Sequence, residues 1–205
     1  MSLLNYATAA QTLFDPQSAQ SSPANRFLPQ SARISAFLPE QAVKALDAPS
    51  VQATGSVGFS SYALDFSTGG RLSILLKADS STADTRMLVF SHSDLLRLKA
   101  EHPGVPESQL LTEDYCNTIL SHSGDGKFRF SGFTAKQYAD TFYFRIVKGT
   151  GAGRVYSAVE SYSVTKYCER MINDGIADGT DDLCRAICEY SAAAREYFGY
   201  TVNGN

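Results

Sequence analysis

The chain has 205 residues, of which 43% are hydrophobic and 19% are charged, which is the composition of an ordinary globular protein with a substantial core. The formal net charge of -3 at pH 7 gives no electrostatic reason to expect nucleic acid or an anionic membrane surface as a partner. No apolar run approaches the roughly 18 residues of a spanning helix, so we expect no membrane insertion by this fragment.

The first predicted element is a helix over residues 1–14, which ends where Asp15-Pro16 cannot continue it. Its apolar residues recur at helical spacing and match a second segment near the end of the chain. The matched positions are Leu3 with Ile187, Tyr6 with Tyr190, Ala9 with Ala193, Ala10 with Ala194, and Phe14 with Phe198. We interpret the first helix as the end of a preceding unit in a tandem array. We expect it to bury Leu3, Tyr6, Ala10 and Phe14 on the strand-rich body that follows.

Residues 15–50 are rich in Ser, Gln, Ala and Pro, which predicts an extended connector on the surface. Strand patterns begin near Val51 and continue to residue 163. Alternating apolar residues on either side of Gly69-Gly70 predict a hairpin, and Gly124-Asp125-Gly126 predicts a turn that joins two further strands. The apolar run 87–90 and the alternating residues Phe142, Phe144 and Ile146 predict two more strands. Ser91-His92-Ser93-Asp94 ends the first of these and is expected to cap a short helix through Leu95, Leu96 and Leu98. Seven or eight short strands favour an antiparallel β-sandwich of the immunoglobulin-like (Ig-like) kind over 51–163.

Helical periodicity returns after Ser163, a plausible N-cap, and an amphipathic helix is expected to end at Asp174-Gly175. A second helix begins at Thr180 with acidic residues in its first turn and ends at Gly199. Its expected buried face is formed by Leu183, Ile187, Tyr190, Ala194 and Phe198. The predicted fold is therefore mainly β with flanking helices: an N-terminal helix, a sandwich, and a C-terminal helical pair over 164–205 packed on the sandwich.

The last part of the chain resembles a known module. Tyr162–Ile172 (YSVTKYCERMI) and Asp181–Tyr200 (DDLCRAICEYSAAAREYFGY) are similar to the C-terminal signature of a repeated module in large surface proteins of gut Gram-positive anaerobes. That family places a β-sandwich before a helical pair ending in Tyr-x-Ala-Ala-Ala-x-x-Tyr-Phe, and the resemblance extends over residues 133–200. It implies an extracellular or cell-surface setting and neighbouring modules as partners, and it implies no established activity. Cys184 and Cys188 replace apolar residues of the family pattern.

The cysteines permit three interpretations. Cys168, Cys184 and Cys188 fall on the two C-terminal helices, with Cys184 and Cys188 one turn apart, and Cys116 lies elsewhere. They fill the core as small apolar residues, or Cys168 pairs with Cys184 or Cys188 in a disulfide, or the three begin a zinc site. The core interpretation is favoured, because no CxxC pair and no nearby His completes a tetrahedral site.

Catalytic residues are not assigned, and we expect no enzyme, cofactor or metal. His92, His102 and His122 are the side chains suited to acid–base work near neutral pH, but their Ser-rich surroundings are typical of polar loops and caps. The segment 173–179 resembles a calcium loop at some positions, yet Ile176 and Arg185 stand where oxygen ligands are required.

The sequence thus favours a non-catalytic structural or adhesive module of a multidomain cell-surface or secreted protein. Its partners would be neighbouring modules of the same chain, and a glycan or another surface protein is a further candidate. The alternative is a carbohydrate-binding module that uses Tyr side chains on a sheet face or in a groove, since the chain has 11 Tyr.

Overall fold

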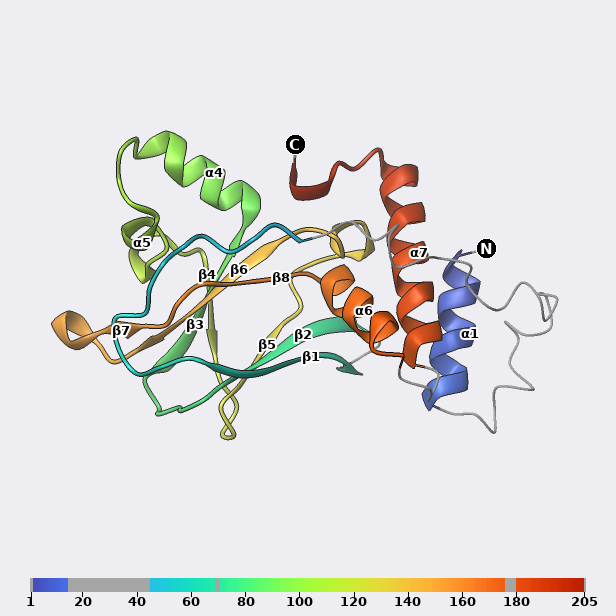
Figure 1. The fold of residues 1–205 in the computed structure, drawn as a ribbon, viewed down its shortest axis with the longest axis horizontal. Helices are drawn as coiled ribbons and strands as arrows, with labels where there is room; N and C mark the ends of the chain where they lie inside the picture. Colours follow the sequence, from blue (N-terminus) through green and yellow to red (C-terminus); the bar gives the residue numbers. More distant parts are fainter. Residues whose placement is uncertain (1, 15–44, 69–70, 176–179, 205) are drawn as a thin grey trace. The chain divides into compact units, whose positions relative to one another are not determined.

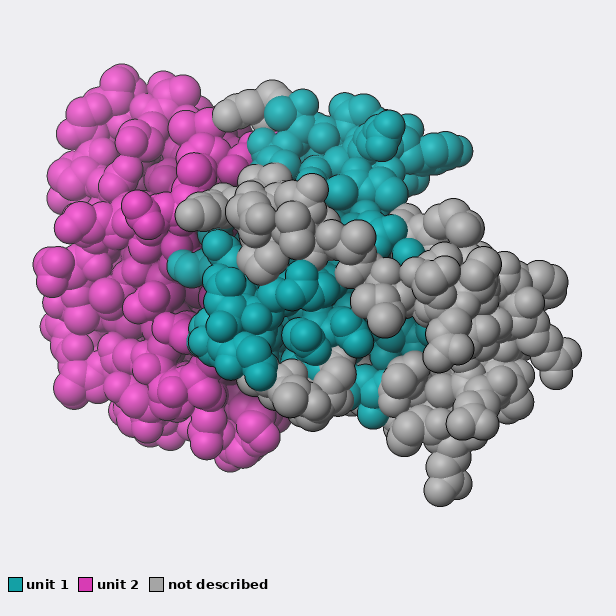
Figure 2. Space-filling model, turned by 45° about the vertical axis from the view of Figure 1, so that its right-hand side comes forward, with its two compact units in different colours: residues 1–45, 133–139, 163–202 teal, residues 46–132, 140–162, 203–205 magenta. Residues whose placement is uncertain are grey.

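The structure, a computed structural model, describes residues 2–14, 45–68, 71–175 and 180–204. They form eight antiparallel strands and five α-helices (Figure 1). The chain divides into two compact units, which Figure 2 colours separately. We call them the helical unit, residues 1–45, 133–139 and 163–202, and the strand unit, residues 46–132, 140–162 and 203–205.

The strand unit contains two antiparallel sheets. The first has the order β1-β2-β5, with β1 at Phe59–Thr68, β2 at Arg71–Ala78 and β5 at Lys127–Phe130. The second has the order β4-β3-β6-β7, and β8 also pairs with β6. Its strands are β3 at Thr85–Ser91, β4 at Thr118–Ser121, β6 at Phe142–Lys148, β7 at Val155–Tyr156 and β8 at Glu160–Tyr162.

The hairpin expected around residues 69–70 is confirmed by the pairing of β1 with β2, and Leu72, Ile74 and Leu76 are buried as their alternation predicts. The turn at Gly124-Asp125-Gly126 does join two strands, but they belong to different sheets, since β4 pairs with β3 and β5 pairs with β2. The Gly-Asp-Gly motif predicts that the chain reverses direction, but it does not predict which strand each of the two strands pairs with. It therefore marks a crossover between sheets.

Aromatic side chains connect the two sheets. The ring of Phe130 on β5 lies with its centroid 4.9 Å from that of Phe142 and 5.9 Å from that of Phe144, both edge-to-face. Tyr62 of β1 stacks on Tyr162 of β8 with centroids 5.0 Å apart. Such ring pairs stabilise a contact beyond the apolar area that they bury.

The central strands of the larger sheet, β3 and β6, are buried on both faces, whereas the alternation of Phe142, Phe144 and Ile146 predicts one buried face for β6. Residues on the opposite side of β6, such as Tyr143 and Val147, join a second core with Leu88 and Phe90 of β3. Two helices complete that core, α4 at His92–Glu101 and α5 at Glu107–Leu110. The short helix expected after residue 90 is confirmed as α4. Its capping box is formed by Ser91, whose side chain accepts from the Asp94 amide at 3.1 Å, and by Asp94, which accepts from the Ser91 amide.

The helical unit is built around α7 at Thr180–Phe198. This helix packs against α1 at Ser2–Phe14, against α6 at Val164–Asn173, and against the short 3₁₀ turn η4 at Ala135–Gln137. The expected N-cap of α6 is confirmed, since the Ser163 side chain accepts from the Lys166 amide at 3.0 Å. Gly175 and Gly199 follow the two helices with φ of 62° and 57°, left-handed values that favour glycine at helix ends.

The helix expected at the start of the chain is present as α1, but its expected packing was wrong in two respects. Its partner is α7, and among the side chains of α1 that the structure describes, Asn5, Thr8 and Ala9 are buried while Leu3 is 55% exposed. Small residues on this face let two helix backbones approach closely, and apolar periodicity alone does not report such a face. Phe14 and the connector 15–44 lie outside the described side chains and residues.

A buried arginine lies in the second core of the strand unit. Arg145 of β6 is 1% exposed, and its guanidinium donates to the carbonyl oxygens of Ser157, Ser108 and Leu111 at 3.1, 2.9 and 2.8 Å. The guanidinium also lies 4.5 Å from the ring centroid of Tyr156. Burial lowers the pKa of Arg145 from its ordinary value. Arg145 therefore ties the loop after α5 and the segment after β7 to the central strand.

Replacing Arg145 should show that this network is structural. We expect Arg145→Ala to reduce the free energy of unfolding by about 3 kcal/mol or more, because buried carbonyl groups lose their donors. The matched control is Arg97→Ala on the exposed side of α4, which should change it by less than about 0.5 kcal/mol. Chemical denaturation measures both, and equal losses in the two variants would contradict the structural role.

Candidate functional site

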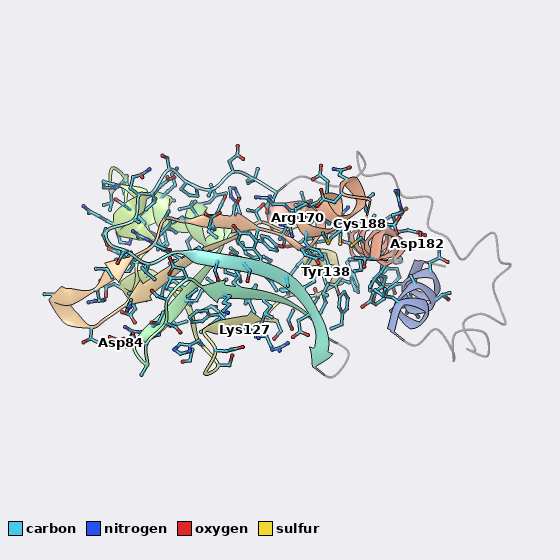
Figure 3. The ribbon with its side chains drawn as sticks, turned by 60° about the horizontal axis from the view of Figure 1, so that its bottom comes forward. Asp84, Lys127, Tyr138, Arg170, Asp182 and Cys188 are labelled. Carbon is cyan, nitrogen blue, oxygen red and sulfur yellow. The ribbon has the colours of Figure 1, made fainter. Side chains whose placement is uncertain are left out.

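Aromatic and thiol side chains from four segments meet in the helical unit. They are Tyr6 of α1, Tyr138 directly after η4, Cys168 of α6 and Tyr190 of α7. The rings of Tyr6 and Tyr190 are nearly parallel, with an interplanar angle of 5° and centroids 5.7 Å apart. Beside this stack, Nδ2 of Asn5 donates to the Glu189 carboxylate at 3.2 Å. Figure 3 labels Tyr138 and Cys188 in this unit.

Two phenols of this cluster, those of Tyr6 and Tyr138, have raised pKa values. Burial raises the pKa of Tyr138 well above its ordinary value, and the neighbouring hydroxyls of Tyr6 and Tyr190 add to the effect. Burial, followed by the proximity of Tyr190, also raises the pKa of Tyr6. A phenol with a raised pKa stays protonated at neutral pH and supplies no phenolate that could act as a base or nucleophile. The cluster is therefore suited to packing and to hydrogen bonding.

The three helical thiols form a buried group. Cys168, Cys184 and Cys188 are at most 2% exposed, and all four cysteines of the chain are free thiols. Burial raises the pKa of Cys168 strongly, and hydrogen bonds with Cys184 and Cys188 add to the shift. Among the described residues, no three His, Cys, Asp or Glu side chains are arranged to hold a metal ion. This geometry fits the interpretation of the thiols as small core residues.

Thiol labelling in the folded protein tests that interpretation. We expect a disulfide reagent to react with Cys116, which is partly exposed, and to reach the other three thiols only after unfolding. Reductant and chelator should leave the melting temperature unchanged. Cys116→Ser provides the control, since this variant should lose all rapid labelling. A second rapidly labelled thiol, or a melting temperature that reductant lowers, would contradict the core interpretation.

The histidines lie in three separate places. His92 begins α4, with Nδ1 3.0 Å from the hydroxyl of Tyr143, and the ring of His102 packs edge-on against Tyr115 after the same helix. His122 follows β4, and its ring nitrogens lie against the carbonyl oxygens of Ser123 and Thr82, contacts that raise its pKa. Each histidine contacts residues that lie around its own loop or helix end, and the fold does not bring the three side chains together in one site.

Among the side chains of the helical unit that the structure describes, the most exposed aromatic ones lie at the end of α7. Tyr197 is 83% exposed and Phe198 is 62% exposed, although periodicity predicts that Phe198 is buried. Nζ of Lys136 lies 5.4 Å from the ring centroid of Phe198 and 5.0 Å from that of Tyr200. We call these four residues the terminal aromatic patch. Such a patch can contact an apolar or planar partner.

The strand unit has an open groove of about 410 Å³ between the turn after β4 and strand β5. Two ion pairs, Lys127 with Asp125 and Arg129 with Asp65, involve charged residues of its lining. The contact with Lys127 and the hydroxyl of Ser123 hold the pKa of Asp125 well below its usual range. The groove therefore presents charges that are already paired and a carboxylate that is a weak base.

In comparisons with known proteins, no family model, no curated protein and no solved structure matches the chain. Within the described part of the chain, no helix has the length and apolar character needed to cross a membrane. The contact between α1 and α7 links two segments whose sequences resemble each other. No pattern within either helix alone marks this contact, and the match between the two segments does not by itself show that they touch.

Proposed function

We propose that this chain is a non-catalytic structural or adhesive module of a multidomain cell-surface or secreted protein. The observation that carries the proposal is the packing of α1 on α7, two helices with the same sequence pattern. In an array of such modules, a helix of the α1 type that precedes each module would be held by the α7 helix of that module. The helical unit then acts as the joint between modules.

The contacts of α1 and α7 occur between corresponding positions. Tyr6 stacks on Tyr190, and Asn5 donates to Glu189, each pair being separated by 184 residues in the chain. Figure 1 shows the two helices side by side and running in opposite directions. In an antiparallel pair, positions that contact their own equivalents lie at a local two-fold axis. The joint is therefore a pseudo-symmetric helix pair centred on the two tyrosines.

The strand order supports an Ig-like assignment for the strand unit. If strands β1 to β7 are lettered A, B, C, C′, E, F and G, the two sheets are ABE and C′CFG. Ig domains of the constant type have ABED and CFG, and those of the variable type add C′ to the CFG sheet. Three features depart from these orders: β8 pairs with β6 in the second sheet, the described residues include no D strand, and a layer of α4 and α5 covers the second sheet. Such domains commonly serve as modules in surface proteins.

The extracellular setting rests on the resemblance of residues 133–200 to the surface-protein module. Neighbouring modules are the first partners that we propose. The carbohydrate-binding alternative requires exposed Tyr side chains on a sheet face or in a groove. The tyrosines on the strands are buried or half-buried, and the groove beside β5 is lined by no Tyr among the described residues. The one exposed Tyr is Tyr197, on a helix. The structural reading is therefore the better supported of the two.

A double-mutant cycle tests the joint. Tyr6→Ala and Tyr190→Ala should be coupled by about 0.5–1.5 kcal/mol in the free energy of unfolding, because each removes half of one aromatic pair. The matched control pairs Tyr6→Ala with Tyr197→Ala, since Tyr197 is exposed and should show coupling below about 0.5 kcal/mol. Equal coupling in both cycles, or none in either, would contradict the joint.

A further inference from the structure

We propose that Asn5 and Glu189 decide which helix α7 accepts as its partner: a helix of the α1 type is accepted, and the α7 helix of a second copy is rejected. This inference rests on the helix joint described above and adds its selectivity. The occupant of the α7 face is thus a helix with a neutral donor at the position before its tyrosine, supplied by this chain or by the first helix of another copy.

The reason for selection lies in the similarity of the two helices. Both helices have a tyrosine, Tyr6 or Tyr190, with two alanines three and four residues after it. The α7 helix of a second copy therefore carries most of the features that fit this face. The tyrosines would stack, and the alanines would permit the same close approach. If nothing else distinguished the two helices, α7 would pair with the α7 helix of a second copy as readily as with α1.

Asn5, which precedes Tyr6 near the local two-fold axis of the helix pair, provides this selection. Asn5 is 7% exposed, and its Nδ2 lies 3.2 and 3.5 Å from the two carboxylate oxygens of Glu189. In a pair of two α7 helices, the position of Asn5 would be taken by a second Glu189. Two carboxylates would then meet in a partly buried contact where α1 supplies a hydrogen-bond donor. Like charges in such a contact repel strongly, and a repulsive element of this kind is how related interfaces exclude wrong partners.

An exchange of the two residues in the full chain tests the selection. Asn5→Glu should reduce the hydrogen-exchange protection of residues 2–14 about tenfold or more, the effect of two like charges in contact. Adding Glu189→Asn to that variant should restore protection, because the donor and the carboxylate have changed places. Ala7→Glu, at an exposed position of α1, is the control and should leave protection unchanged. Unchanged protection in Asn5→Glu, an equal loss in the control, or no rescue would overturn the proposal.

Peptides then measure the preference directly. The Asn5→Glu chain, with its own α1 released, is titrated with a synthetic peptide of residues 2–14 and with one of residues 186–198. The first should bind about tenfold more tightly or better, and Glu189→Asn in the second peptide should remove most of the difference. Equal binding of both unmodified peptides, or binding of neither, would contradict the selection. If the Tyr6–Tyr190 coupling persists while these results fail, the joint stands and only its selectivity is wrong.

Discussion

The stack of Tyr6 on Tyr190 is the contact on which the helical unit depends. An amphipathic helix of 13 residues is marginal in water, so α1 requires a surface against which to bury its inner face. α7 supplies that surface and at the same time contacts α6 and the η4 turn. Asn5 and Tyr6 fix the register of the pair, since a shift of one residue would separate both from their partners. The chain thus holds its first helix through a residue pattern that it repeats near its end.

The strand unit depends on burial of β3 and β6 from both sides. One side faces the aromatic residues of the smaller sheet, and the other faces α4, α5 and the segment at Val51. Arg145 lies on the second side, where carbonyl groups from loops replace the water that a guanidinium would otherwise bind. A layer of helices therefore makes the larger of the two sheets an interior layer, and this explains why β6 contains both apolar and cationic buried residues.

Much of the local structure could be predicted from the sequence, because caps and turns are encoded within a few residues. Ser91 with Asp94, Ser163, and the glycines after α6 and α7 marked helix ends that the structure confirms. The periodicity of apolar residues could not show which element packs against each face of a helix or strand. It assigned Leu3 and Phe198 to buried faces and gave β6 one buried side, because it records spacing and not what lies opposite. The α1–α7 contact left a signal in the matched segments, but the match did not show that the two helices touch.

A joint of this kind requires that α1 folds and unfolds together with α6 and α7. Native-state hydrogen exchange in increasing denaturant measures this, because segments of one cooperative unit converge on a common opening free energy. We expect the amides of α1 to join those of α6 and α7 in a single opening event. If the amides of α1 exchange at the rate of an unprotected peptide while those of α6 and α7 stay protected, the first helix is not part of the unit and the helical joint does not exist.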